Sequence, residues 1–248
     1  MLSKMKDIAS VKDKRVVLLQ SGGLDSCFIA FYLKYFGFEI HHLYIDYGQK
    51  AREKELIAAK KIVNRVGGEL HCVTIDMPWL KDSTILVDDT KDIGTYKVSP
   101  RFGCVQSGVY VPLRNHVLIS IAGSLAESLA IPYIASGIDG LQDIFGRPVN
   151  STDKHKKFAE KLEDSITEAS TLYHIHGKKI KIIAPMIRLT KEQEIKFGTE
   201  VFGAHWEDSW TCYNSKEKPC GECCACKDRL MHFKNAGIED PTEYLSRD

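Results

Sequence analysis

Short apolar runs alternate with longer amphipathic segments along the first part of the chain. Val16–Leu19 is an apolar run between a charged residue and a Ser-Gly-Gly turn, and residues 39–45 and 69–75, in which apolar and polar residues are mixed, are predicted as the second and third strands. Such runs are typical of strands buried in a parallel sheet. We interpret His41 and His42, in the second run, as strand side chains rather than ligands.

Predicted helices separate these strands. Residues 25–36 are mostly apolar and stop before Gly37, and residues 51–66 are amphipathic and stop before Gly67. The repeated strand–helix order predicts an α/β protein with a doubly wound, Rossmann-like parallel sheet.

The alternation breaks at residues 76–111, which are rich in Asp, Thr, Gly and Pro and lack clear periodicity. Long segments of this kind are usually functional or mobile, so we expect an insertion or lid at an active site. The helix–strand pattern then resumes, with predicted elements at 115–129 (capped by Asn115), 133–136, 153–170, 179–183 and, behind a capping box at Thr190 and Gln193, a final helix.

Composition limits the possibilities further. The apolar share of 44% is normal for a globular protein, and the net charge of +1 gives no overall argument for nucleic acid, membrane or an acidic partner. No apolar run is long enough to span a bilayer, and the N-terminus lacks a signal-peptide core. We expect a cytoplasmic protein with a main domain at 1–204 and a C-terminal segment, 205–248, that packs on it.

Five of the eight cysteines lie between residues 212 and 226. Four of them follow the spacing Cys212-x7-Cys220-x2-Cys223-x2-Cys226. This spacing matches a structural zinc site with four sulfur ligands, and Cys-x2-Cys on both sides favours Cys223 over the spare Cys224. An iron–sulfur cluster is the alternative, and redox thiols without a metal are less favoured. A closed site of four sulfurs leaves no open position for catalysis, so we assign it a structural role.

The turn after the first strand carries the candidate chemistry. In the string Ser21-Gly-Gly-Leu-Asp-Ser26, the turn directs backbone N–H groups and the positive end of a helix at one spot, which suits a phosphate. Asp25 would repel an anion, so it indicates a bound Mg²⁺ or a charged neighbour. A tight turn without a ligand is the alternative for the two glycines alone. The string is neither a Walker A loop nor the dinucleotide fingerprint.

The complete string resembles the SGGxDS loop of the ATP-pyrophosphatase superfamily, whose members bind ATP and release pyrophosphate. A longer ordered set of motifs is similar to the 7-cyano-7-deazaguanine synthase family over residues 15 to about 235. The motifs are Ser21–Ser26, Asp46–Gln49, Val111–Asn115, Ser136-Gly137, Thr211–Asn214 and Cys220–Cys226.

This resemblance implies an ATP-dependent C–N ligase that adenylates the carboxylate of 7-carboxy-7-deazaguanine, forms the amide with ammonia and dehydrates it to the nitrile. The implied nucleotide-binding residues are Gln20, Ser21, Gly22, Gly23, Leu24, Asp25, Ser26, Tyr47, Gln49, Asn115 and Gly137, and the implied catalytic residues are Asp25, Arg114, Lys191 and Asp153. The resemblance also suggests a homodimer.

Individual roles follow from the chemistry of these side chains. Asp25 would hold Mg²⁺, which offsets charge as phosphorus is attacked. Arg114 suits a phosphate or carboxylate, unless it is a structural or surface arginine. Lys191 either lies near the α-phosphate or is solvated. Gln49 and Asn115 would contact AMP or the purine-like edge.

Three segments depart from the family pattern. Leu113 stands where the family usually has Gly, and residues 139–146 are less acidic than the corresponding stretch of the family. The family's Tyr-Pro-Asp-Cys-Arg sequence keeps only its Asp, as Asp153, and here Lys154 and His155 follow it. A divergent enzyme could therefore stop at the amide, or transfer the activated deazaguanine to an amine on a protein or nucleic acid. Two more distant functions also stay open. One is an inactive, zinc-stabilised nucleotide-binding module, and the second is a tRNA-thiolating enzyme, which would need a catalytic cysteine pair.

Overall fold

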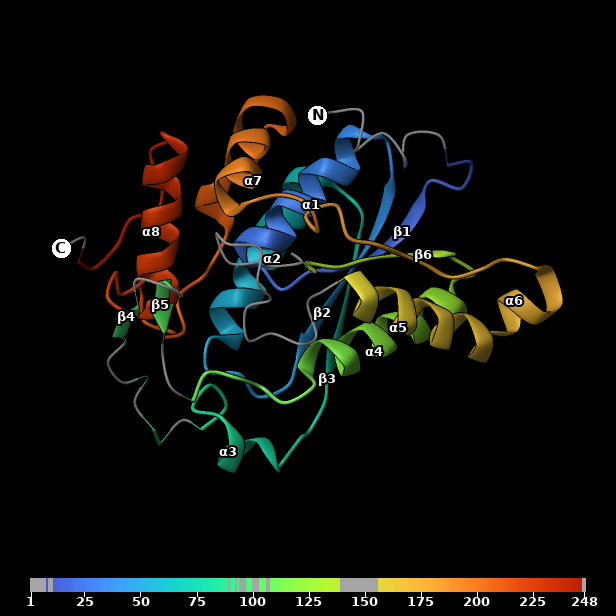
Figure 1. Ribbon diagram of the computed structural model, residues 1–248, viewed down its shortest axis with the longest axis horizontal. Coiled ribbons are helices and arrows are strands. Elements are labelled where there is room, and N and C mark those ends of the chain that lie inside the picture. The colour runs from blue at the N-terminus through green and yellow to red at the C-terminus, as the bar shows by residue number, and fades with distance from the viewer. Residues whose placement is uncertain are drawn as a thin grey trace.

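The computed structural model describes Ile8 and residues 11–88, 90–91, 93, 97–99, 103–105, 108–138 and 156–246. Its centre is a five-stranded, all-parallel sheet with the strand order β3-β2-β1-β6-β7 (Figure 1). The strands are β1 (Arg15–Leu19), β2 (Glu39–Asp46), β3 (Glu69–Thr74), β6 (Tyr133–Ala135) and β7 (Lys181–Ile183). The predicted doubly wound α/β fold is confirmed.

Helices cover both faces of the sheet because side chains alternate along its strands. In β1, Val16 and Leu18 belong to the core on one face and Val17 to the core on the other, and all three are fully buried. The core on the first face includes residues of α1 (Leu24–Tyr35), α2 (Arg52–Val66), α7 (Lys191–Phe197) and α8 (Cys224–Ala236), and the core on the second face includes residues of α4 (Arg114–Ser128), α5 (Lys156–Ala169) and α6 (Thr171–His176).

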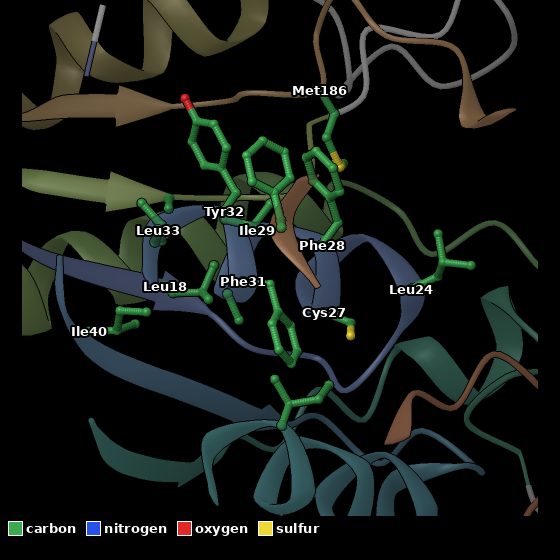
Figure 2. Packing of buried hydrophobic residues seen from close by; sticks show 14 of the residues in the cluster. Leu18, Leu24, Cys27, Phe28, Ile29, Phe31, Tyr32, Leu33, Ile40 and Met186 are labelled. Atoms are coloured by element: carbon green, nitrogen blue, oxygen red, sulfur yellow. The ribbon is translucent and has the colours of Figure 1, made fainter. Parts of the chain in front are cut away.

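Helix α1 supplies the aromatic centre of the first core. Phe28 and Tyr32 stack with ring centroids 6.2 Å apart, and both make edge contacts with Phe202 in the π-helical turn Gly198–Phe202. Figure 2 shows Phe28 and Tyr32 extending from α1 toward the Met186 side, whereas Phe31 extends the opposite way. Each buried aromatic ring removes roughly 150–250 Å² of surface from water, so these residues anchor α1 in the first core. The turn that precedes α1 is thereby anchored as well.

A third apolar cluster joins the insertion at 76–111 to the cysteines of the C-terminal segment. Leu80 and Val111 pack there with Cys212 and Cys226. The insertion contains α3 (Leu80–Ser83) and a hairpin of β4 (Lys97–Ser99) and β5 (Gly103–Val105). Strand β5 lies beside α8 at one end of the molecule (Figure 1). The insertion and the C-terminal segment therefore pack on each other.

Most predicted elements lie within a few residues of their observed bounds. The capping box at Thr190 is confirmed, because Thr190 Oγ1 accepts from Gln193 N and Gln193 Oε1 accepts from Thr190 N. Asn115 as an N-cap is wrong. Helix α4 already begins at Arg114, the cap position is Leu113, and no side chain caps this end.

Two sequence expectations fall outside the described residues. These are the departures at 139–146 and 151–155, the second of which includes Asp153. Among the helices that the structure does describe, none has the length and hydropathy to cross a membrane.

Candidate active site

A cavity of about 210 Å³ lies at the carboxyl ends of β1 and β6. The helix that follows β1 lies on one face of the sheet, and the helices that follow β6 lie on the opposite face. The edge between these two neighbouring strands is therefore a topological switch point, the usual ligand site in open α/β sheets. The polar lining consists of Gln20, Ser21, Asp25, Ser26, Tyr44, Tyr47, Gln49, Glu55, Arg114, Asn115, Ser136 and Gly137.

The glycine turn between β1 and α1 is held by close backbone contacts. Gly22 has a φ of +78°, and a Cβ atom there would lie 2.3 Å from the carbonyl oxygen of Glu55 in α2. Any larger residue would therefore force the turn and α2 apart. The backbone N–H of Trp210 donates to the Gly22 carbonyl at 2.8 Å, so the C-terminal segment holds the same turn from another side.

Hydroxyl groups line the turn in a chain of hydrogen bonds. Ser21 Oγ accepts from the Gly23 N–H at 3.2 Å and lies 3.2 Å from Ser26 Oγ, which donates to the Gly23 carbonyl at 3.0 Å. The fully buried Gln20 donates its amide to Ser26 Oγ at 3.1 Å. This network orients the hydroxyls beside the positive N-terminus of α1, where an anion is favoured.

His42 supports this network from inside the first core. Its Nδ1 lies 3.2 Å from Gln20 Oε1 and its Nε2 lies 3.1 Å from the Gly67 carbonyl. Burial lowers the pKa of His42 to about 4, so the ring is neutral at pH 7. A neutral imidazole has one N–H and can donate to only one of these two oxygens at a time.

The charged neighbour of Asp25 is Lys191, at the start of α7. Lys191 Nζ lies 2.5 Å from Asp25 Oδ1 and 2.8 Å from Glu194 Oε2, and the Glu194 side chain is 2% exposed. The Lys191 side chain is only 16% exposed, so it is not simply solvated. Across the cavity edge, a Cβ at Gly137 would lie 3.2 Å from Asp25 Cβ, so the small residue allows this close approach.

The opposite wall contains Tyr47, Gln49, Glu55 and Arg114. Gln49 Oε1 accepts from the Tyr47 N–H at 2.9 Å, and its Nε2 donates to Glu55 Oε2 at 2.9 Å. Burial raises the pKa of Glu55 and of Tyr47, although the Gln49 bond opposes the first shift and the Arg114 charge the second. Arg114 Nη1 lies 3.4 Å from the Tyr47 hydroxyl, so its cationic group is directed into this wall.

Four cysteine sulfurs meet in the third apolar cluster. Cys212, Cys220, Cys223 and Cys226 are buried with their Sγ atoms within 4.8 Å of one another. The Cys212–Cys220 and Cys223–Cys226 pairs are 3.5 Å apart, and Cys212–Cys223 and Cys220–Cys226 are 3.9 Å apart. A tetrahedral ion with bonds of about 2.3 Å needs sulfurs about 3.8 Å apart, so one zinc ion fits.

The local backbone explains how these sulfurs converge. Gly221, between two of the ligands, has a φ of +77°, and a Cβ there would collide with the carbonyl of Ser246 at 1.6 Å. The N–H groups of Asn214 and Cys220 donate to Cys212 Sγ at 3.4 Å each, which favours a thiolate. Cys224 Sγ lies elsewhere, 3.8 Å from Asp228 Oδ2.

Comparison with known proteins gives one family. The family model "Queuosine biosynthesis protein QueC" matches residues 15–237. A 7-cyano-7-deazaguanine synthase from Clostridium kluyveri is 34% identical over 236 residues, covering 93% of this chain and 98% of that protein. One from Methanobrevibacter smithii is 35% identical over 237 residues, with the same coverages. The chain belongs to the QueC family.

A solved 4-thiouridine synthetase in complex with RNA and bound ATP has a TM-score of 0.46 and 15% sequence identity, covering 90% of this chain and 50% of that chain. Similarity at this level carries no argument about function.

Most of the site residues implied by the resemblance meet at the cavity. The structure places Gln20, Ser21, Asp25, Ser26, Tyr47, Gln49, Arg114, Asn115 and Gly137 at the cavity, with Gly22 and Gly23 forming its turn and Lys191 paired to Asp25. Leu24 is 6% exposed and belongs to the first core instead. Asp153 lies outside the described residues.

Glu55, Glu194 and His42 belong to the site but were not predicted from the sequence. Glu55 and Glu194 occupy helical positions that look like ordinary charged surface residues, and both face inward toward polar partners, Gln49 and Lys191. His42 was assigned to a strand correctly, but its contact with Gln20 depends on the register of β1 with β2. No local sequence signal identifies these contacts.

Proposed function

We propose that this QueC-family chain is an ATP-dependent ligase that converts 7-carboxy-7-deazaguanine and ammonia into 7-cyano-7-deazaguanine. The observation that carries the proposal is the cavity at the switch point, where the Ser21–Ser26 turn, the Asp25–Lys191 pair and Arg114 meet. The names of the curated relatives support the same product, and nothing in the comparisons favours a different acceptor, an inactive module or a thiolating enzyme.

The reaction needs two adenylations. A carboxylate oxygen attacks the α-phosphorus of ATP, pyrophosphate leaves, and ammonia displaces AMP from the mixed anhydride to give the amide. The amide oxygen then attacks a second ATP, and loss of protons and AMP leaves the carbon–nitrogen triple bond. In both adenylations the protein must bind the pyrophosphate group of ATP while an oxygen of the organic substrate approaches the α-phosphorus.

The cavity residues suit these tasks. The turn hydroxyls and N–H groups at Ser21, Gly23 and Ser26 would hold the departing pyrophosphate. Lys191 and Arg114 would place positive charge on either side of the phosphates, where charge develops. Asp25 with the neighbouring hydroxyls is a donor set that suits Mg²⁺, which takes few protein ligands beside phosphates. When bound, that ion would offset phosphate charge.

Mass spectrometry of the product tests this function. Full-length protein with ATP, Mg²⁺, ammonium and the carboxylate is expected to give AMP, pyrophosphate, the amide and then the nitrile. Asp25→Asn is expected to slow AMP release about 10²–10³-fold, because a charged group at the reacting phosphate is removed.

The matched control is Asp164→Asn, at an exposed position on α5. It should leave AMP release unchanged. The function is refuted if wild-type protein releases no AMP and forms neither amide nor nitrile, or if it stops at the amide with ATP in excess.

Several finer statements are parts of this proposal. We propose zinc as the ion of the cysteine centre, because four sulfurs within 4.8 Å of one another suit one ion, whereas an iron–sulfur cluster binds its cysteines through separate irons. The homodimer, the cytoplasmic location and the domain division at residues 204 and 205 stay predictions. Size-exclusion chromatography with light scattering tests the first of these.

A further inference from the structure

The sequence repeats a short pattern in two adjacent strands. Glu39-Ile-His41 begins β2, and Glu69-Leu-His71 begins β3. The strands pair in parallel with His41 opposite Glu69 and Leu43 opposite His71. Residues two apart share a face of a strand, so the two glutamates and two histidines all lie on one face of the sheet.

This face is the one that carries the second core. Leu43 and Val73, two residues beyond each histidine, belong to or pack against that core. His42 points to the opposite face and contacts Gln20, so the two neighbouring histidines of β2 have separate environments. Both were predicted only as strand side chains, and the pairing of β2 with β3 is what distinguishes His41.

Three side-chain atoms converge on one point in this cluster. His41 Nδ1 and His71 Nε2 are 3.3 Å apart, and each lies 3.7 Å from Glu69 Oε2. A point equidistant from all three lies about 2.1 Å from each, which equals the usual zinc–nitrogen and zinc–carboxylate bond lengths of about 2.0–2.2 Å.

We propose that His41, Glu69 and His71 form a binding site for a divalent transition-metal ion such as Zn²⁺, separate from the cysteine centre. Two imidazoles with one carboxylate suit borderline ions such as zinc, nickel and copper, and not Mg²⁺, which prefers oxygen ligands. The fourth coordination position takes water, because no other metal-binding group of the described residues belongs to this cluster.

A second contact supports the assignment. His41 Nε2, the nitrogen that faces away from the ion, lies 3.5 Å from Glu39 Oε1. Metal-binding histidines commonly direct their other ring nitrogen to a carboxylate, which orients the ring and strengthens the ligand. The repeated Glu-x-His pattern therefore supplies one carboxylate to the ion and one to its ligand.

Accessibility also suits reversible binding. The His41 and His71 side chains are 14% and 24% exposed, whereas Glu69 is 66% exposed, so the ion reaches the site from solvent without opening the fold. The cluster lies at the amino ends of β2 and β3, and the cavity lies at the carboxyl ends of the strands. An ion here would link the edge strand to its neighbour without contacting the reacting groups.

Calorimetric titration of full-length protein with Zn²⁺ tests the proposal, starting from protein that has been loaded with one equivalent of Zn²⁺ per chain at the cysteine centre. Wild type is expected to bind one further Zn²⁺ per chain and not to respond to Mg²⁺. We expect His71→Ala to abolish this event and Glu69→Gln to weaken it at least tenfold. The matched control His176→Ala changes an exposed histidine on α6 and should bind as wild type does.

Thermal unfolding gives an independent readout. Zn²⁺ should raise the unfolding temperature of wild type and His176→Ala but not of His71→Ala, and without added Zn²⁺ the three should unfold alike. If His71→Ala is itself unstable, the milder Glu69→Gln still decides the matter. A wild type with no second zinc, or equal affinity in wild type and Glu69→Gln, overturns the site.

Discussion

Lys191 places one cation between two carboxylates at the edge of the cavity. Its ammonium group contacts Asp25 and the buried Glu194, which come from α1 and from its own helix. Removing one partner of such a buried group leaves the remaining charges uncompensated. Lys191 therefore balances the two carboxylates in the free protein, and in the proposed reaction it would offer positive charge to a phosphate.

Replacement of Lys191 by Met is expected to reduce AMP formation about 10²–10³-fold, because one preorganised charge at the reacting centre is lost. The measurement is steady-state release of AMP with the carboxylate and ammonium. Lys196→Met, at an exposed position of the same helix, controls for helix stability and should retain wild-type turnover. Equal rates in the two variants would contradict a role for Lys191 at the phosphates.

Leu113 has a backbone conformation that suits glycine. Its φ is +50°, its side chain is largely exposed, and it precedes the first residue of α4. The resemblance to the family implies Gly at this position, a residue that adopts this conformation without strain. A left-handed conformation costs an ordinary residue about 1–2 kcal/mol.

Leu113→Gly should consequently be more stable than Leu113→Ala by about 1 kcal/mol, the reverse of the usual order for these two residues. Urea unfolding measures the difference, and alanine serves as the control because it removes the side chain and keeps the strain. An alanine variant as stable as the glycine variant would show that the turn relaxes in solution.

Among single residues, those that follow from local motifs could be predicted. Ser21 and Asp25 are fixed in position by the turn between a strand and a helix, and the sequence contains that whole unit. Glu55 and Glu194 could not be predicted, because their inward direction depends on how their helices pack. Asn115 was misassigned as a cap because the left-handed Leu113 is the cap residue, so α4 begins two residues earlier than a helix capped by Asn115 would.

At the scale of elements, the cysteine centre supports the insertion. Leu80 of α3 and Val111 at the end of the insertion pack in the same apolar cluster as the four cysteines. Tyr47 and Tyr213 pack against this cluster, and Tyr47 also lines the cavity. An ion that holds the cysteines therefore also holds one wall of the active site.

If the cysteines hold the proposed ion, its loss should loosen the insertion. We expect Cys223→Ser to speed limited proteolysis within this segment by on the order of tenfold, since a site that couples metal binding to folding is broken. Cys224→Ser is the matched control, because Cys224 lies outside the four-sulfur cluster. Similar cleavage of both variants would show that the cluster does not order the insertion.

The predicted elements differ in how well the sequence defined them. β1 and α1 were predictable because a buried apolar run and a glycine stop mark them locally. The hairpin β4–β5 was not, since its strands are three residues each and their place beside α8 depends on tertiary packing. The insertion could be located from its missing periodicity, but its contacts could not.

Across the whole molecule, segments far apart in the chain converge on the turn after β1. Gly22 accepts from Trp210, Asp25 pairs with Lys191, and Gly137 approaches Asp25. The fully buried His42 supports the turn through Gln20. The active site therefore depends on the global fold, and global stability should influence it directly.

The His42 ring makes this stability depend on pH. Its folded pKa of about 4 is below the usual unfolded value of about 6.5, so the unfolded state binds more protons between these values. The stability that neutral His42 supplies is present above pH 6.5 and is lost as the pH falls toward 4. We expect a loss of about 2 kcal/mol between pH 7 and pH 5.

Urea unfolding of wild type and His42→Gln at both pH values measures this contribution. The variant is less stable at pH 7 but should lose about 2 kcal/mol less on acidification. His174→Gln, at an exposed position on α6, is the control and should follow wild type. Parallel pH profiles for wild type and His42→Gln would assign the acid sensitivity to other groups.

The strand order has a consequence for synthesis on the ribosome. β1 is the first strand made, yet one of its two neighbours, β6, is completed only at residue 135. At about 5–20 residues per second, one edge of the nascent β1 stays unpaired for roughly 6–23 s until that neighbour is made. During this interval the emerging chain exposes an apolar surface of the kind that chaperones bind, and a pause in translation between residues 46 and 133 would prolong that exposure.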